Sequence, residues 1–171
     1  MTNRTVALIF LIGLPGSGKS SFAARLVEEC PERYLISTDM IRSHLFGSED
    51  IQGPWLKVFS EVGQQFRQAV QLIQQEQAIA AIYDATNVVR KQRREALALA
   101  RESGFTHITG IWLNVPLWLC LKRNQTRDRQ VPPEVIQRMS QRLCAAPPSE
   151  QEDLDQLFEV QPWNRAEARG R

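Results

Sequence analysis

A glycine-rich loop that directly follows an apolar run constrains the fold of this chain more than any other feature. The loop reads GLPGSGKS at residues 13–20, and residues 6–12 before it read VALIFLI. Its pattern, G-x-x-x-x-G-K-S/T, is typical of the turn between a buried strand and a helix, where backbone N–H groups and the helix dipole bind phosphate. A turn without a ligand needs neither the lysine nor the serine, so the pattern predicts a phosphate-binding loop.

Each part of the loop has a predicted task. The glycines let the backbone aim N–H groups at phosphate oxygens, and Pro15 stiffens the loop where no N–H is needed. Lys19 is expected to reach the β- and γ-phosphates, and Ser20 to bind the Mg²⁺ that bridges them. The residues predicted to bind nucleotide are Gly13, Pro15, Gly16, Ser17, Gly18, Lys19 and Ser20. We therefore predict ATP and Mg²⁺ as cofactors, although the loop does not distinguish ATP from GTP.

The length and the cysteines indicate one domain without structural cross-links. A chain of 171 residues suits a single domain, which we expect to span residues 1–171. Cys30, Cys120 and Cys144 are odd in number and widely spaced, which argues against a disulfide framework and a zinc site. The run at 6–12 is too short to span a bilayer and lacks the features of a signal peptide. We expect a cytoplasmic protein that does not bind membranes.

Composition and charge leave the macromolecular partners open. The chain is 43% hydrophobic and 23% charged, as is ordinary for a globular domain, and its formal net charge is +2. Proteins that bind nucleic acid through charge carry a clearer basic excess, so the sequence neither requires nor excludes a nucleic-acid partner. It also leaves the oligomeric state undetermined.

Strand patterns alternate with helix patterns along the chain. Strands are expected at residues 6–12, 34–36, 78–83, 107–113 and 157–160. Helices are expected after Ser20 as far as Pro31, and at 54–77, 90–103, 116–127 and 133–143. This alternation predicts a three-layer α/β/α fold with a doubly wound parallel sheet, whose ligands bind at the carboxyl ends of the strands. Residues 162–171 are expected to fray, with Trp163 available to pin them back.

The segment STDMIR at residues 37–42 offers a carboxylate and a guanidinium where the second strand ends and a helix begins. Asp39 and Arg42 lie one helical turn apart, so both side chains can face one cavity. A carboxylate there can accept the proton of a hydroxyl that attacks a γ-phosphate, while the arginine holds a negative part of the acceptor. The alternative is that Asp39 only caps the helix. The spacing favours the functional interpretation.

A second carboxylate, Asp84, stands at the tip of the apolar run at 78–83. This is the arrangement of the acidic residue that supports Mg²⁺ in phosphate-loop enzymes, so we predict Ser20 and Asp84 at the metal. Thr86 and Asn87 follow directly. They are candidates to orient Asp84, to contact the acceptor or to cap the next helix.

A cluster of basic residues begins the helix expected at 90–103, where the helix dipole disfavours positive charge. Its members are Arg90, Lys91, Arg93 and Arg94. We interpret most of them as a solvated face that Glu95 partly neutralises. Arg90 is the expected exception, and we predict that it binds an anionic part of the substrate.

Two further arginines, Arg123 and Arg127, are four residues apart and are expected to share one face of the helix at 116–127. A mobile segment that brings arginine onto a transferring phosphate is a recurring device, because charge spreads over the γ-phosphoryl oxygens in the transition state. The alternative is a basic helix end that its own dipole stabilises. We predict a lid at about residues 127–132, with both arginines binding nucleotide.

In this order, the motifs resemble the phosphate-loop kinase family that includes polynucleotide 5'-hydroxyl kinases and zeta-toxin-like kinases, with an AAA-type ATP-binding kinase domain. The resemblance covers most of residues 5–143. It rests on GLPGSGKS at 13–20, STDMIR at 37–42, YDATNVVRKQRR at 83–94, VPLWLCLKRNQTR at 115–127 and VPPEVIQRM at 131–139. It implies the nucleoside-kinase-like form of the P-loop NTPase fold.

The resemblance also implies roles for individual residues. Lys19 and Ser20 would bind the nucleotide phosphates and Mg²⁺, Asp39 would be the general base, and Arg127, together with Arg123, would act from the lid. Asp84 matches an acidic active-site position in that family. The residues expected to bind the acceptor are Asp39, Arg42, Asp84, Thr86, Asn87 and Arg90, and those expected to be catalytic are Asp39, Lys19 and Arg127.

These features predict an ATP-dependent phosphotransferase that moves the γ-phosphoryl of ATP·Mg²⁺ to a hydroxyl, for which a nucleic-acid 5'-hydroxyl is one candidate. Residues 46–55 carry no substrate motif, the lid is shorter than in polynucleotide kinases, and basic residues interleaved with aromatic ones are sparse. A kinase of sugar, nucleoside or antibiotic hydroxyls is therefore a close alternative. A nucleotide-binding ATPase or switch module is a third, which would leave Asp39 and Arg42 without a task.

Overall fold

Five parallel strands form the centre of the molecule. The computed structural model describes residues 4–161. The strands are β1 (Ala7–Ile12), β2 (Arg33–Ser37), β3 (Ala80–Asp84), β4 (His107–Leu113) and β5 (Gln156–Val160), in the spatial order β2-β3-β1-β4-β5. Since β1 lies in the middle and the chain extends the sheet first to one side and then to the other, the predicted doubly wound parallel sheet is confirmed.

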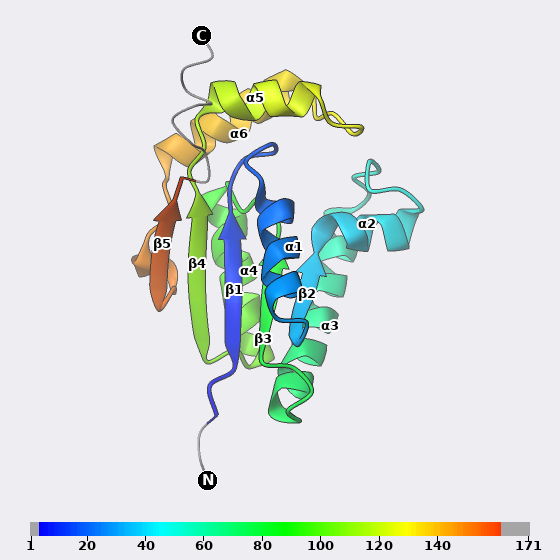
Figure 1. Cartoon of the computed structure of the whole chain (residues 1–171), viewed down its shortest axis with the longest axis vertical. Coiled ribbons are helices and arrows are strands. Elements are labelled where there is room, and N and C mark those ends of the chain that lie inside the picture. The colour runs from blue at the N-terminus through cyan, green and yellow to red at the C-terminus, as the bar shows by residue number, and fades with distance from the viewer. Residues whose placement is uncertain (1–3, 162–171) are drawn as a thin grey trace.

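Helices cover both faces of the sheet and the carboxyl ends of its strands. They are α1 (Lys19–Glu29), α2 (Thr38–Phe46), α3 (Trp55–Gln74), α4 (Arg90–Ser103), α5 (Leu117–Gln125), α6 (Pro133–Ala145) and the short 3-10 helix η1 (Glu150–Glu152). Figure 1 shows α1 on one face, α3 and α4 on the opposite face, and α5 with α6 across the ends of the strands. The three predicted layers are therefore present, and one end of the sheet lies under a helical cover.

The larger core lies between the sheet and the layer of α3 and α4. The inward stripe of α3 includes Val62, Phe66 and Ile73, all fully buried, as the 3.6-residue periodicity predicts. Phe66 packs edge-on against Tyr83 of β3, with ring centroids 5.1 Å apart, and against Phe105 at 5.6 Å. These contacts fix the end of β3, and therefore Asp84, relative to the layer of helices.

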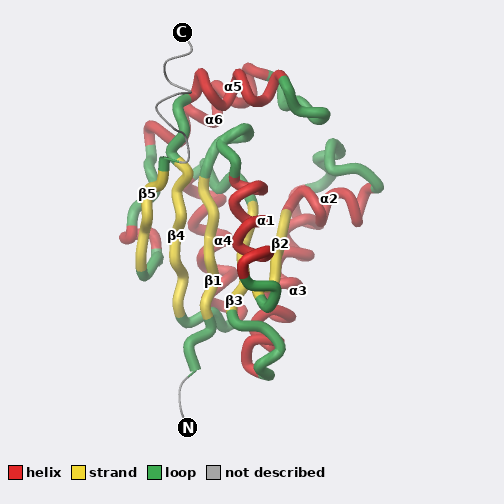
Figure 2. Tube along the Cα trace, in the orientation of Figure 1, coloured by secondary structure: helices red, strands yellow, loops and turns green. Residues whose placement is uncertain are grey.

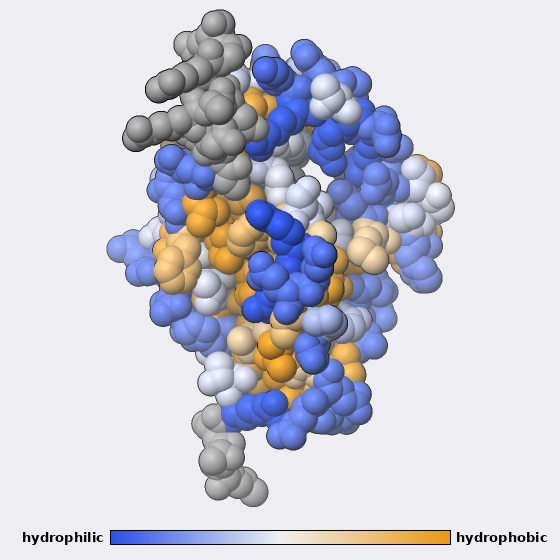
Figure 3. All heavy atoms as spheres, in the orientation of Figure 1, coloured by the Kyte–Doolittle hydropathy of each residue, from blue (hydrophilic) through white to orange (hydrophobic). Residues whose placement is uncertain are grey.

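The face under α1 has a smaller core. Leu11, Ala23 and Ile82 are fully buried there. Figure 3 shows apolar side chains at the surface beside α1, because this one helix covers only part of the face. Phe158 of the edge strand β5 is 52% exposed.

The structure corrects several expected boundaries. Helix α3 is shorter than the predicted 54–77, and α5 ends at Gln125, so Arg127 lies in the loop after the helix and not on its face. Helix η1 was not predicted. The expectations for residues 162–171 and Trp163 lie outside the described residues. Across residues 4–161, every helix is too short or too polar to cross a membrane.

Candidate functional site

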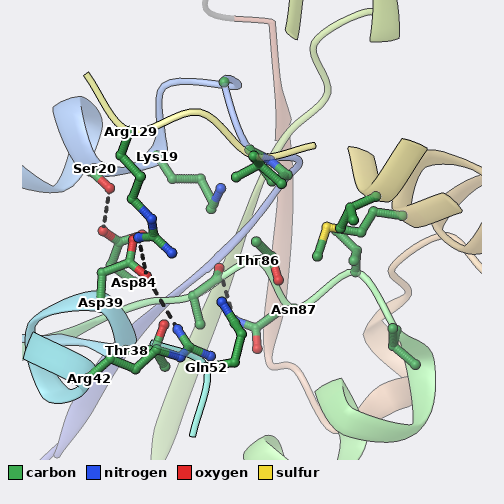
Figure 4. Close-up of a pocket in the computed structure, with 18 of the residues that line it drawn as sticks. Lys19, Ser20, Thr38, Asp39, Arg42, Gln52, Asp84, Thr86, Asn87 and Arg129 are labelled. Atoms are coloured by element: carbon green, nitrogen blue, oxygen red, sulfur yellow. Dashed lines mark hydrogen bonds and ion pairs between the residues drawn. The ribbon is translucent and has the colours of Figure 1, made fainter. Parts of the chain in front are cut away.

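A cleft of about 950 Å³ opens at the carboxyl ends of the strands. The phosphate-binding loop, the start of α2, the loop after β3 and the segment from α5 to α6 form its walls, and Figure 4 shows its central part. The predicted site residues that line it are Pro15, Gly16, Gly18, Lys19, Ser20, Asp39, Arg42, Asp84, Thr86, Asn87, Arg123 and Arg127. Most of the residues that the sequence singled out therefore meet in one place.

The loop at residues 13–20 needs glycine for conformation and for space. Gly16 and Gly18 have φ angles of 82° and 90°, in the left-handed region that favours glycine. A β-carbon on Gly16 would lie 2.5 Å from the carbonyl oxygen of Cys120, so the loop packs directly against the backbone of α5. Gly13 and Ser17 are buried members of the same loop and are not among the residues that line the cleft, so their contact with nucleotide stays a prediction.

Lys19 is a buried cation inside the loop. Its Nζ donates a hydrogen bond to the carbonyl oxygen of Leu14 at 3.0 Å. Burial lowers the pKa of Lys19, and the nearby Asp84 carboxylate opposes that shift. A phosphate next to the ammonium group would favour its charged form. The loop therefore presents a cation that an anionic ligand can stabilise.

Ser20 and Asp84 place a hydroxyl and a carboxylate next to each other near Lys19. The Ser20 hydroxyl donates to Oδ2 of Asp84 at 2.8 Å (Figure 4). Burial raises the pKa of Asp84, while Lys19 and the Ser20 hydrogen bond hold it down. A hydroxyl and a carboxylate suit Mg²⁺, which takes few protein ligands and completes its shell with phosphate and water. Within residues 4–161 no cluster of three or more acidic, histidine or cysteine side chains is placed to hold a metal ion.

Asp39 faces the cleft and does not cap its helix. The N-cap of α2 is Ser37, whose hydroxyl oxygen accepts a hydrogen bond from the Met40 backbone N–H at 3.4 Å. Asp39 Oδ1 instead lies 3.2 Å from Nη1 of Arg42, and the Nε of Arg42 is buried without a partner among the described residues. The helix-cap alternative for Asp39 is therefore wrong.

Sequence reasoning missed Arg129, which joins two loops across the cleft. Its Nη1 lies 3.2 Å from Asp39 Oδ1, and its Nε lies 2.7 Å from Asp50 Oδ1. Figure 2 shows the two loops facing each other, one after α5 and one after α2. Position 129 falls inside the predicted lid, but nothing in the sequence indicates that the loop with Asp50 folds toward it.

The loop after β3 is held by its own polar groups. Asn87 has a φ of 50°, and its side-chain amide donates to the carbonyl oxygen of Leu11 at 2.7 Å. The carbonyl oxygen of Thr86 accepts the Gly13 N–H at 3.0 Å, which leaves the Thr86 side chain toward the cleft (Figure 4). Asn87 therefore ties this loop to the end of β1, and it does not cap α4, whose N-cap residue is Val89. Contact of Asn87 with the acceptor stays a prediction, since Asn87 also lines the cleft.

Two arginines of the basic cluster on α4, Arg90 and Arg93, lie elsewhere than predicted. Arg90 lies outside the cleft, and its Nε is 3.2 Å from Glu152 Oε1. Arg93 is fully buried, and its Nε and Nη2 contact the two oxygens of Glu152 at 2.5 and 2.8 Å. The solvated-face interpretation is therefore wrong for Arg93, and the structure does not bring Arg90 to the substrate side.

Asn124 fixes the base of the loop that carries Arg127 and Arg129. Its side chain is 2% exposed, donates to the Val131 carbonyl oxygen at 2.8 Å and accepts the Val131 N–H at 2.9 Å. This closed pair of bonds defines a loop at residues 125–131, slightly earlier than the predicted lid. The sequence offered no signal for it beyond a polar residue on the inner side of a helix.

We expect Asn124→Ala to loosen this loop. Loss of two partly buried hydrogen bonds should lower the free energy of unfolding by about 1–3 kcal/mol, and the affinity for nucleotide should fall because Arg127 is held less firmly. Urea unfolding and ATP titration measure the two effects. Gln125→Ala is the matched control, because Gln125 is exposed and its only described contact here uses the backbone. Equal behaviour of the two variants would contradict this role of Asn124.

Comparison with known proteins agrees with the fold and the loop. The family model described as "AAA domain" matches residues 8–147. The L-seryl-tRNA(Sec) kinase of Methanococcus maripaludis is 30% identical over 140 residues, which cover 80% of this chain and 52% of that protein. The chain thus spans about half the length of this curated relative.

Solved structures with a similar fold include proteins named as kinases. The Pnkp1/Rnl/Hen1 RNA repair complex has a chain that matches with a TM-score of 0.68 and 20% identity over 90% of this chain and 48% of that one. A fungal RNA kinase matches with a TM-score of 0.67 and 14% identity over 96% and 78%. A gluconokinase from Sinorhizobium meliloti matches with a TM-score of 0.58 and 16% identity over 96% and 88%. At these identities the likeness concerns the fold alone.

Proposed function

This chain belongs to the AAA domain family of phosphate-loop kinase domains, and from that premise we propose that it transfers the γ-phosphoryl of ATP·Mg²⁺ to an acceptor hydroxyl. The observation that carries the proposal is that a phosphate-binding loop and the carboxylate of Asp39, which two arginines contact, line the same cleft. A loop alone would support nucleotide binding, whereas the carboxylate provides a base for a second substrate.

The donor half consists of the loop, the Ser20–Asp84 pair and the lid arginines. Lys19 and the loop N–H groups would hold the β- and γ-phosphates. Mg²⁺, held by Ser20 and Asp84, would neutralise charge on the same phosphates. Arg123 and Arg127 line the cleft from the end of α5 and the loop after it. Guanidinium groups there can stabilise the charge that spreads over the transferred phosphoryl group. Because ATP is supplied in the cytoplasm, the proposal places the protein there.

The acceptor half lies around Asp39. Its carboxylate would accept the proton of the attacking hydroxyl, while Arg42, one turn along α2, would hold the acceptor near it. Thr86 borders the same space (Figure 4). We infer a hydroxyl carried by a nucleic acid as the acceptor, because the relative named above, 30% identical to this chain, is by name an L-seryl-tRNA(Sec) kinase.

The acceptor class is tested by incubating the protein with ATP labelled on the γ-phosphate and separate panels of hydroxyl-ended oligonucleotides, unmodified and aminoacylated tRNA, and small metabolites. Label in the nucleic-acid panel supports the proposal. Label only in sugars, nucleosides or antibiotics would support a small-molecule kinase instead. Release of labelled phosphate to water, with no acceptor labelled, would favour an ATPase or switch module.

The metal assignment makes a separate prediction. Ser20→Ala removes one of the two proposed oxygen contacts, so the Mg²⁺ concentration for half-maximal activity should rise at least severalfold, and excess EDTA should abolish activity in wild type. A Mg²⁺ titration of turnover measures the change. Ser21→Ala is the matched control, since Ser21 is the next residue of the same helix and also borders the cleft. Identical Mg²⁺ curves for the two variants would contradict a ligand role for Ser20.

A further inference from the structure

Arg129 reaches across the cleft from the loop at residues 125–131 to the opposite wall. Its Nη1 lies 3.2 Å from Oδ1 of Asp39, and its Nε lies 2.7 Å from Oδ1 of Asp50. Figure 4 shows this side chain pointing at Asp39. The residues after Asp50 that also line the cleft are Gln52, Gly53 and Trp55. The cleft is therefore open on that side, and one arginine bridges it.

Each of the two loops that Arg129 joins keeps its shape through its own hydrogen bonds. In the loop at residues 47–53, the Ser48 hydroxyl oxygen accepts the Asp50 N–H at 3.2 Å. In the loop at 125–131, the Gln130 amide donates to the Gln125 carbonyl oxygen at 2.9 Å. Within residues 4–161, Arg129 makes every ion pair between the two loops. The bridge can therefore break while both walls keep their form.

Arg129 has several carboxylates to bind, so it can leave Asp39 and still be paired. Its side chain is 17% exposed, and its Nη1 lies 3.9 Å from Oε2 of Glu49, while its Nε stays with Asp50. Asp39 in turn keeps Arg42 at 3.2 Å. A charge taken from its partner is costly when nothing replaces that partner, but here each group retains one. The contact between Arg129 and Asp39 is therefore one that a ligand can replace.

This contact competes with a substrate at the proposed base. Arg42 and Arg129 both lie 3.2 Å from the same oxygen, Oδ1 of Asp39. A hydroxyl that gives its proton to a base has to come within about 2.6–3.2 Å of it, so it needs space that the two arginines hold. Arg42 shares α2 with Asp39, whereas Arg129 comes from another loop and has further partners. Arg129 is therefore the group that yields.

We propose that Arg129 makes the transfer selective for an acceptor hydroxyl over water, and this inference rests on the proposed function. We call its contacts with Asp39 and Asp50 the Arg129 latch. While the latch is closed, Asp39 is occupied. An acceptor that also binds the walls of the cleft supplies the binding energy to displace Arg129 from Asp39, and water does not. Asp50 then keeps Arg129, and with it the lid, beside the acceptor.

The side reaction that the latch prevents is hydrolysis of ATP. In that reaction a water oxygen bonds to the γ-phosphorus, and the bond from the γ-phosphorus to the β,γ-bridging oxygen breaks. ADP leaves, and the proton of the attacking water passes to Asp39. Since transfer to a hydroxyl uses the same base, the nucleophile that reaches Asp39 decides the product. Loss of the latch should therefore increase hydrolysis, a gain of activity that a structural role of Arg129 does not predict.

The test measures the release of labelled phosphate from γ-labelled ATP·Mg²⁺ by the full chain without acceptor. Arg129→Met removes the charge of the latch and keeps most of the side-chain length. Arg138→Met is the matched control, because Arg138 is exposed on α6 and is not among the residues that line the cleft. A double variant, Asp39→Asn with Arg129→Met, shows whether a gain passes through the base. Urea unfolding verifies that each variant is folded, and transfer to the best acceptor is measured in parallel.

We expect Arg129→Met to release phosphate at least about tenfold faster than wild type, within the range that a general base contributes. The control should match wild type, and the double variant should return to the wild-type rate or below it.

Three results would overturn the latch and leave the proposed transferase in place, provided that wild type labels an acceptor. They are unchanged hydrolysis in Arg129→Met, a gain that persists in the double variant, and loss of both hydrolysis and transfer in folded Arg129→Met. The last result would make Arg129 a contact of the transferred phosphoryl group. If wild type labels no acceptor, the proposed function and the latch both fail.

Discussion

Replacing Asp39 with asparagine is expected to lower turnover by about 10²-fold or more while the affinity for ATP stays nearly unchanged, because the variant loses the proton acceptor and keeps the phosphate-binding loop. Asparagine keeps the shape of the side chain and an oxygen for Arg42 and Arg129, which both lie 3.2 Å from Oδ1 of Asp39. Steady-state kinetics with saturating acceptor, together with ATP titration, separates the two quantities.

A control is needed because the same substitution weakens an ion pair of Arg129. Asp50→Asn weakens a different ion pair of that arginine, at 2.7 Å, and leaves Asp39 intact. We expect its effect on turnover to stay below about tenfold, since a partly exposed ion pair is worth little on its own. If the two variants lose activity equally, Asp39 acts through the loop contact and not as a base.

The second large effect concerns stability. Arg93→Met should lower the free energy of unfolding by about 3 kcal/mol or more, because it leaves Glu152, itself 4% exposed, without its buried partner. The variant also frees the carbonyl oxygens of Asn87 and Ala146 that Arg93 binds at 3.0 Å. Arg90 still contacts Glu152 at 3.2 Å from the exposed side, which keeps the expected loss from being larger.

Urea unfolding of the variant measures this loss, and Arg94→Met is the matched control. Arg94 is the next residue of α4 and is exposed, so its substitution should change stability by less than about 0.5 kcal/mol. A variant at position 93 that is as stable as the control would mean that the pair adds nothing net to the fold. In that case the pair would serve only to define the loop after β3.

Local patterns were sufficient to predict the sheet and much of the cleft. Three patterns each span only a few consecutive residues: the glycine loop, the strand that ends in Asp84, and the helical turn with Asp39 and Arg42. Spacing alone therefore predicts which way their side chains face. The alternation of strands and helices then fixes the end of the sheet at which they meet. Their chemical roles stay predictions.

The misses share a physical cause, which is pairing between residues distant in the sequence. Arg93 looked solvated because its partner, Glu152, lies 59 residues away on a short 3-10 helix that has no periodic pattern. Arg129 depends in the same way on a loop at residues 47–53. The sequence predicted Arg127 on a helix, but α5 ends at Gln125. The backbone N–H groups of Thr126 and Arg127 bind carbonyl oxygens three residues back, and the Asn124 side chain then binds the Val131 N–H, which closes the loop.

The most direct test of a two-substrate site is a rapid-quench measurement of the γ-phosphoryl of labelled ATP·Mg²⁺, with and without the best acceptor from the panels. A single cleft that holds donor and acceptor predicts that label leaves ATP rapidly only when acceptor is present, and that nearly all of it is then covalently bound to the acceptor. Release of labelled inorganic phosphate at the same rate with and without acceptor would contradict the account, because water would then be the substrate and Asp39 would have no hydroxyl to activate.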